Sequence, residues 1–99
     1  KALARKLGIA LVTHGKIVTT PARAQFVRRF VEPLVTTAKV NTLTSRRRLI
    51  SAFGNSEAAS LLLKRAEAYQ SRPGGYTRVT RLPVFRSGDR APQVLIEFV

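Results

Sequence analysis

Apolar residues recur at helical spacing over the first 14 positions of the chain. Gly15 follows as a C-terminal stop, so the pattern predicts a helix over residues 1–14. Residues 16–19 (KIVT) are rich in β-branched side chains and too few for a helix, so they are predicted to form a strand. Thr20 and Pro21 then predict the start of a second helix, because threonine is a good N-cap and proline is tolerated at the first helical position.

This second helix is predicted from a long apolar stripe with a polar face opposite it. The stripe consists of Val27, Phe30, Val31, Leu34, Val35 and Ala38, and the polar face of Gln25, Arg28, Arg29, Glu32, Thr36 and Lys39. Pro33 interrupts neither set, although a proline in a helix interior costs about 3 kcal/mol. Two arrangements fit, a kink near residues 29–32 or two shorter helices, and the unbroken stripe favours the kink.

Two shorter helices are expected next. The turn-forming residues 41–45 precede RRRLISAF and Gly54, which predicts a third helix with three arginines on its first turn. Cations there oppose the helix macrodipole, which indicates an external anionic partner. Ser56 is predicted to cap a fourth helix that ends before Pro73, and its buried stripe is Ala59, Leu62, Leu63, Ala66 and Tyr69.

After Gly75 the periodicity changes to that of strands. Residues 76–85 and 91–99 are rich in β-branched and aromatic side chains, and the glycine-containing residues 86–90 connect them in an antiparallel hairpin. The second strand is expected to place one set of side chains on a common face: Val94, Ile96 and Phe98. Pro83 and Pro92 indicate strands near a sheet edge.

Together these elements predict a single domain over residues 1–99 of the α+β class. We expect a small three-stranded mixed sheet with a C-terminal β-hairpin, packed against about four helices. A chain of 99 residues is long enough for one modest core.

The stretch SRPGGYTRV (71–79) raises the question of a phosphate-binding glycine loop. Such loops run from strand to helix, whereas Gly74 and Gly75 lie between a predicted helix and a predicted strand. The better interpretation is a helix stop, with Pro73 ending the helix and one glycine in the left-handed conformation.

Net charge is the most informative property of the composition. The chain has 18 Lys and Arg against 5 Asp and Glu, a formal net charge of +13, and 13 of the cations are arginine. Such a charge indicates a polyanionic partner, and arginine grips phosphate oxygens bidentately and stacks on bases. Nucleic acid is therefore favoured over a membrane surface, and no apolar run has the length of a membrane span.

The chain offers little for catalysis or metal binding. It has no cysteine and a single histidine, His14, which we expect either to close the first helix or to touch a phosphate. The carboxylates are scattered over different elements, and each has a structural role available: Glu32, Glu57, Glu67, Asp89 and Glu97. We therefore expect no enzyme activity, no metal, no cofactor and no small-molecule substrate.

Basic residues cluster in four places, near the N-terminus, in the third helix, around the glycine turn and at the hairpin tip. The predicted nucleic-acid-binding residues are Lys1, Arg5, Lys6, His14, Lys16, Arg46, Arg47, Arg48, Arg72, Tyr76, Arg78, Arg81, Arg86 and Arg90. For Tyr76, stacking on an unpaired base and a place in the core are equally open. Charge reversal at Arg86 or Arg90 is expected to impair assembly more than reversal at Arg65, which shares a helix with Glu67.

Six motifs in one register, covering essentially the whole chain, resemble the family of bacterial-type large-subunit ribosomal protein seventeen. They are THGKIVTTPARA (13–24), FVEPLVTTAK (30–39), SRRRL (45–49), PGGYTR (73–78), RSGDRAP (86–92) and LIEFV (95–99). The resemblance implies a structural, non-catalytic protein of the large subunit with an α+β fold. It also implies binding to large-subunit ribosomal RNA near the exit of the nascent-peptide tunnel, beside neighbouring ribosomal proteins.

Two further expectations follow from this resemblance. Family members usually begin with a basic arm before the first helix, and this chain starts at Lys1, so the arm is expected to be absent. The protein is expected in the ribosome, in the cytoplasm or in an organelle.

Two other functions compete with this one. A free-standing nucleic-acid chaperone or DNA-binding regulator fits the charge, with residues 46–48 on a short helix in a major groove. An RNA hydrolase lacks an acid–base pair and ranks last.

Overall fold

The structure of the chain is a computed structural model that describes residues 2–85, 88 and 90–99. Its helices are α1 (Ala2–His14), α2 (Pro21–Val40), α3 (Leu43–Phe53) and α4 (Ser56–Ala66), followed by the 3-10 turn η1 (Glu67–Tyr69). Its strands are β1 (Lys16–Thr19), β2 (Thr77–Phe85) and β3 (Pro92–Phe98). The predicted α+β class is confirmed.

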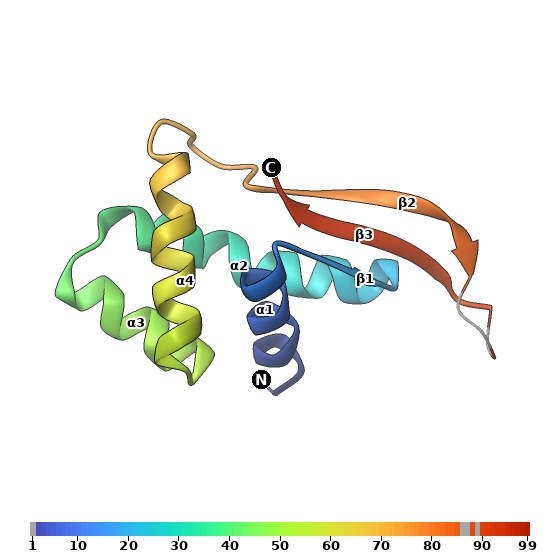
Figure 1. Cartoon of the computed structure of the whole chain (residues 1–99), viewed down its shortest axis with the longest axis horizontal. Coiled ribbons are helices and arrows are strands. Elements are labelled where there is room, and N and C mark those ends of the chain that lie inside the picture. Colours follow the sequence, from blue (N-terminus) through green and yellow to red (C-terminus); the bar gives the residue numbers. More distant parts are fainter. Residues whose placement is uncertain (1, 86–87, 89) are drawn as a thin grey trace.

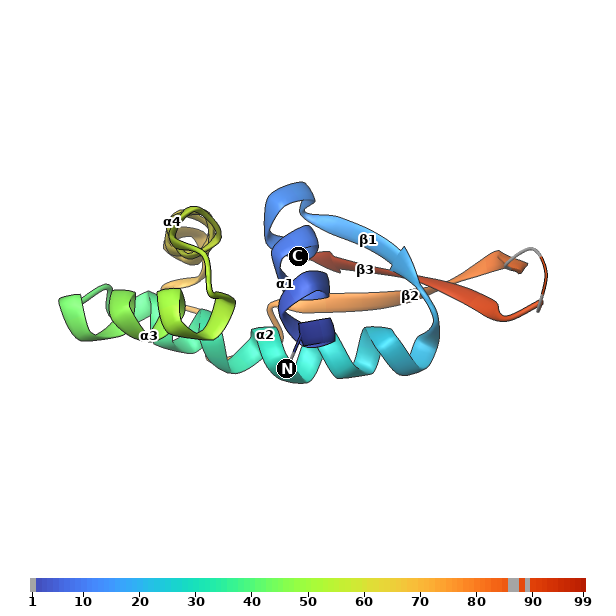
Figure 2. The ribbon, with the colours of Figure 1, turned by 90° about the horizontal axis from the view of Figure 1, so that it is seen from below.

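Helix α2 runs along the length of the molecule and contacts α1, α3, α4 and two strands (Figures 1 and 2). It continues through Pro33 as one helix, so the alternative of two shorter helices is wrong. The apolar stripe predicted for it faces the core, with Val27, Val31 and Val35 fully buried. Because this stripe is unbroken, burial along the whole face offsets the backbone bond that the proline removes.

The starts of the two shorter helices differ from the prediction: α3 begins earlier, and α4 has a different N-cap residue. Helix α3 begins at Leu43 behind a capping box, in which the Ser45 N–H donates to Thr42 Oγ1 at 3.1 Å and the Thr42 N–H donates to Ser45 Oγ at 2.7 Å. Arg46 therefore ends the first turn, as predicted, but Arg47 and Arg48 follow it. Helix α4 is capped by Asn55, one residue before the predicted Ser56, because its Oδ1 accepts from the Ala58 N–H at 2.9 Å.

The three strands form one sheet in the order β1-β3-β2, and both pairings are antiparallel. The predicted mixed sheet is therefore wrong. Gly15, at φ +83°, turns the chain out of α1 straight into β1, and its carbonyl accepts from the Phe98 N–H at 3.1 Å. This turn aligns β1 against the end of β3 in the opposite direction.

The position of β3 also differs from the expectation that both hairpin strands lie near an edge. Strand β2 is at an edge, and its pairing is irregular between Arg81 and Phe85, where Pro83 lies. Strand β3 is central instead. It accommodates Pro92 because β1 pairs with it only as far as Val94, so the start of β3 has an open side.

The core fills the space between α2, the sheet and the other helices. Its fully buried members include Leu11, Leu49, Leu62 and Ile96, and Phe30 meets Phe53 edge to face at 5.8 Å between ring centroids. As predicted, Val94 and Ile96 share the buried face of β3, and Phe98 packs partly against the same core.

Glu32 fastens α2 to the start of β2. One carboxylate oxygen accepts from the Tyr76 N–H at 3.3 Å, and the other accepts from the Thr77 N–H at 2.9 Å and the Thr77 hydroxyl at 2.7 Å. Tyr76 and Thr77 are buried. Their donors would have no other acceptor, so the carboxylate fixes where the chain enters the sheet.

Replacement of Glu32 by alanine is expected to lower the free energy of unfolding by about 2 kcal/mol, because buried donors lose a charged acceptor. Urea unfolding measures the change. The matched control is Glu67→Ala, which removes the same charge from an exposed position and should change stability by less than about 0.5 kcal/mol. Equal effects of the two substitutions would contradict an anchoring role for Glu32.

Candidate nucleic-acid interface

The structure divides the described cations into two groups. Those of the first group donate to, or lie over, other parts of the fold: Arg5, Lys39, Arg46, Arg65, Arg72 and Arg78. Within residues 2–85, 88 and 90–99, the second group has no such partner, and we refer to its members as the unpaired cations: Lys6, Lys16, Arg23, Arg28, Arg29, Arg47, Arg48, Lys64, Arg81 and Arg90. The predicted residues Lys1 and Arg86 lie outside the described residues.

Two predicted site arginines hold helix ends. Arg5 donates through Nε to the Ala52 carbonyl at 3.1 Å and through Nη2 to the Ser51 carbonyl at 3.3 Å, at the end of α3. Arg46 donates to Asn41 Oδ1 at 3.1 Å. Their side chains are exposed, but part of each guanidinium is committed to the fold.

Arg65 makes more contacts with distant parts of the fold than its sequence position indicates. Its Nε donates to the Val12 carbonyl at 2.9 Å, and its guanidinium lies over the Phe98 ring at 5.0 Å from the centroid. It also packs against Gly15, where an added Cβ would meet the guanidinium at 3.0 Å. Arg65 therefore joins α4, the end of α1 and the last strand, and it is unsuitable as the reference for a free surface charge.

The turn around Gly74 and Gly75 is a structural corner. The helical segment ends at Tyr69, before Pro73, and Gly75 has the predicted left-handed conformation at φ +66°. Arg72 lies over the Tyr69 ring at 5.3 Å and donates to the Gly75 carbonyl at 3.4 Å. Arg72 therefore stabilises the turn of which it is itself a part.

Tyr76 is part of the core. Its side chain is 1 % exposed, and its hydroxyl lies 3.2 Å from Thr36 Oγ1 and accepts from Lys39 Nζ at 3.0 Å. Its ring also meets that of Tyr69 at 5.3 Å. A ring so enclosed cannot stack on a base, so of the two alternatives left open by the sequence the core position is observed.

Arg78 belongs to a row of charges across the outer face of the sheet. It forms an ion pair with Glu97 at 3.0 Å, and Lys16 is the register partner of Glu97 on the other side. The Arg78 side chain is 63 % exposed, but Glu97 matches its charge, so the pair is neutral as a whole. Lys16 remains unpaired.

The three consecutive arginines of α3 point in three directions, because successive residues of a helix are rotated by about 100°. Arg46 lines a groove between α3 and α4. Arg48 lines a hollow of about 320 Å³ on the other side, together with hydroxyl side chains that include Thr36, Thr42 and Thr44. The arginines therefore do not form one row along a helix face, which is the arrangement that a groove-reading helix needs.

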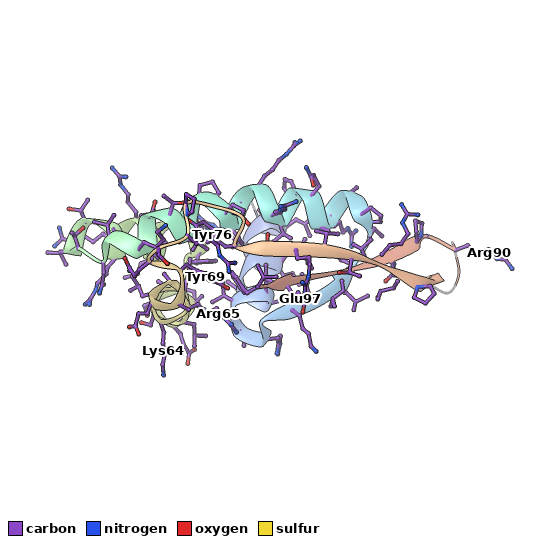
Figure 3. The ribbon with its side chains drawn as sticks, turned by 90° about the horizontal axis from the view of Figure 1, so that it is seen from above. Lys64, Arg65, Tyr69, Tyr76, Arg90 and Glu97 are labelled. Atoms are coloured by element: carbon purple, nitrogen blue, oxygen red, sulfur yellow. The ribbon has the colours of Figure 1, made fainter. Side chains whose placement is uncertain are left out.

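The unpaired cations include residues at opposite ends of the molecule. Arg47 and Arg48 lie on α3, at one end of the longest dimension of 45 Å, and Arg81 and Arg90 lie toward or at the hairpin tip at the other (Figures 1 and 3). The core and α2 hold these two groups apart.

Helix α2 contributes cations that were not among the predicted site residues. Arg23 and Arg29 are exposed, and Arg28 and Arg29 line a hollow of about 340 Å³. The position of Arg28 and Arg29 on the predicted polar face was a usable signal, although Glu32 shares that face and lines the same hollow. His14, at the end of α1, is exposed.

No group of three potential metal ligands gathers among the described residues. None of the helices in this part of the chain has both the length and the apolar content needed to cross a bilayer.

Comparisons with known proteins agree with the resemblance. The family model for ribosomal protein L17 matches residues 3–99. The chain is 46 % identical to large ribosomal subunit protein bL17 of Lawsonia intracellularis over 99 % of this chain and 79 % of that protein. It is 48 % identical to bL17 of Nitratidesulfovibrio vulgaris (99 % and 74 %) and 46 % identical to bL17 of Persephonella marina (100 % and 82 %).

Substitution of Arg65 by alanine is expected to destabilise the protein by about 1–3 kcal/mol, because the Val12 carbonyl loses a charged donor. Lys64→Ala, which removes the same charge from the neighbouring unpaired position, should cost less than about 0.5 kcal/mol. Thermal unfolding of the two variants gives the comparison. An Arg65 variant as stable as the Lys64 variant would show that these contacts contribute nothing.

The two tyrosines of the chain are expected to ionise in separate steps. The hydrogen bond from Lys39, with that from Thr36, lowers the pKa of Tyr76 below 10.0, whereas burial raises the pKa of Tyr69 above it. Tyr76 therefore adds stability above pH 10, and this contribution is lost as the pH falls through its lowered pKa. A phenolate absorbance titration should show two steps; Tyr76→Phe should remove the earlier and Tyr69→Phe the later. A single step at the ordinary tyrosine pKa would contradict both shifts.

Proposed function

This chain belongs to the ribosomal protein L17 family, and from that premise we propose that it binds large-subunit ribosomal RNA through its unpaired cations. A structural role in the large ribosomal subunit is what the names of its relatives support. The finer proposal concerns which side chains meet the RNA and how.

The observation that supports RNA binding is the set of unpaired cations. The fold satisfies six described cations with its own carbonyls, rings and one carboxylate, and leaves ten facing outward. Like charges on a small domain repel one another unless a polyanion neutralises them. Phosphates supply that neutralisation, and release of their counterions favours association.

The separation of the cations indicates how the protein contributes to the subunit. Arg47 and Arg48 at one end and Arg81 and Arg90 at the other are held by a folded core along a molecule 45 Å long. Such a body neutralises two stretches of RNA backbone at once and fixes the distance between them. Recognition is then of shape and backbone, because A-form RNA hides its base edges in a deep, narrow groove.

The proposal extends to surroundings and location. We place the protein near the nascent-peptide exit, beside other large-subunit proteins, as the family resemblance implies. Its location is the bacterial-type ribosome, of the cytoplasm or of an organelle.

Binding to a fragment of large-subunit ribosomal RNA is expected to weaken steeply with salt. With about 6–10 phosphates contacted, affinity should fall by about three to five orders of magnitude between 50 and 200 mM salt. A filter-binding or fluorescence titration across that range measures the slope. Affinity that hardly changes, or a protein absent from large subunits in a sedimentation gradient, would overturn the proposal.

The same assay tests the division of the cations. Replacement of both Arg81 and Arg90 by glutamine should reduce the slope of log K against log salt by about 2, and the Arg47/Arg48 pair should do the same. The matched control is Arg78→Gln with Glu97→Gln, which removes a neutral pair and should leave the slope unchanged. A control that lowers the slope as much would show that paired and unpaired arginines act alike.

A further inference from the structure

We propose that the groove between α3 and α4 binds a segment of a neighbouring protein that presents apolar side chains flanked by carboxylates. The proposal rests on the proposed function, because the partner is expected within the large subunit. It names a surface and a partner chemistry that RNA binding does not explain.

The groove is hollowed between two helices that are packed against each other. Its volume is about 510 Å³, and Ile50 of α3 and Leu63 of α4 line it. Leu43 lies on the same side of α3, one turn before Arg46 and two turns before Ile50. Leu43 and Ile50 therefore form an apolar strip that continues past the end of the groove. A hollow of this size accommodates several side chains of a docked peptide.

The apolar side chains of this strip are unusually exposed. Leu43 is 64 % exposed and Ile50 41 %, while Leu49, on the side of α3 that faces the core, is completely buried. Val40, the other most exposed large apolar residue described at 65 %, lies outside this strip and lines the hollow beside Arg48. The core does not need the side chains of Leu43 and Ile50, so their apolar surface is available to a partner.

Charge indicates what kind of segment the groove accepts. Arg46 and Lys64 stand on its two sides, from α3 and α4, and Arg47 adjoins the strip. Glu67 is the one acid among the lining residues, which leaves the rim positive. A segment with apolar residues for the strip and Asp or Glu for the rim is complementary in both respects.

RNA is the less suitable occupant of this surface. Phosphates would satisfy Arg46 and Lys64, but nothing on an A-form backbone covers Leu43 and Ile50 or gains from doing so. The α2 side of α3 differs in this respect, since five hydroxyl side chains line the hollow beside Arg48 and Val40 is the one apolar residue among them. One short helix thus presents a polar side suited to RNA and an apolar side suited to protein.

Photo-cross-linking in assembled large subunits tests the occupant directly. A benzophenone side chain replaces Leu43 in the full chain, and the subunits are irradiated, digested and analysed by mass spectrometry. The expected product is an adduct with one peptide of a neighbouring protein that contains Asp or Glu near the attachment point. Adducts with nucleotides only, with a peptide lacking acids, or no adduct at all would overturn the proposal.

A second measurement separates this proposal from RNA binding. In the Leu43→Gln/Ile50→Gln variant, retention on salt-washed large subunits should fall about tenfold, while affinity for the isolated RNA fragment stays that of the wild type. Phe26→Gln on α2, where Phe26 is equally exposed at 41 %, is the control and should change neither. Wild-type retention of the double variant would overturn the proposal, as would an equal loss of RNA affinity. Salt-insensitive RNA binding by the wild type would instead overturn the proposed function and leave the adduct at Leu43 unaffected.

Discussion

Eighteen cationic side chains share this chain with five carboxylates, so most of the cations have no acid within reach. The fold satisfies several of them with main-chain carbonyls. Arg5 donates to carbonyls that end α3, and Arg65 donates to a carbonyl in the last turn of α1. Carbonyls at helix C-termini have no partner inside the helix and carry the negative end of the macrodipole, so they are the best acceptors that remain. Aromatic rings stabilise three further contacts by cation–π interaction, those of Lys39, Arg65 and Arg72.

The same shortage makes the few carboxylates important. Glu32 and Glu97 each occupy a position where the sheet would otherwise face only donors or cations. Glu32 acts between elements, because its carboxylate accepts from the two N–H groups at the entrance to β2. Two turns further along α2, Lys39 donates to the Tyr76 hydroxyl. The polar face of α2 thus joins the helix to the last third of the chain by hydrogen bonds, beside the apolar stripe that joins it to the core.

Sequence patterns predicted what depends on local chemistry and missed what depends on distant partners. The strand at residues 16–19, the start of α2 at Pro21 and the buried stripe around Val27 follow from propensity and periodicity, and all are observed. The antiparallel order of the sheet and the roles of Glu32 and Arg65 required knowledge of which segments meet. The same is true of the site. That Arg65 is not available to bind RNA follows from its hydrogen bond to Val12, 53 positions away in the sequence, which no local pattern reveals.

The helical repeat explains how one run of three arginines serves separate surfaces. In a strand, adjacent residues alternate between two faces, but in α3 each successive side chain turns by about 100°, so Arg46, Arg47 and Arg48 diverge. Burial of Leu49 and Phe53 fixes the rotation of the helix, and this sets Arg46 over the groove with α4 and Arg48 over the hydroxyl-lined hollow with α2. A run of like charge in a helix is therefore not one binding patch. Its division among partners is decided by the apolar residues that hold the helix in place.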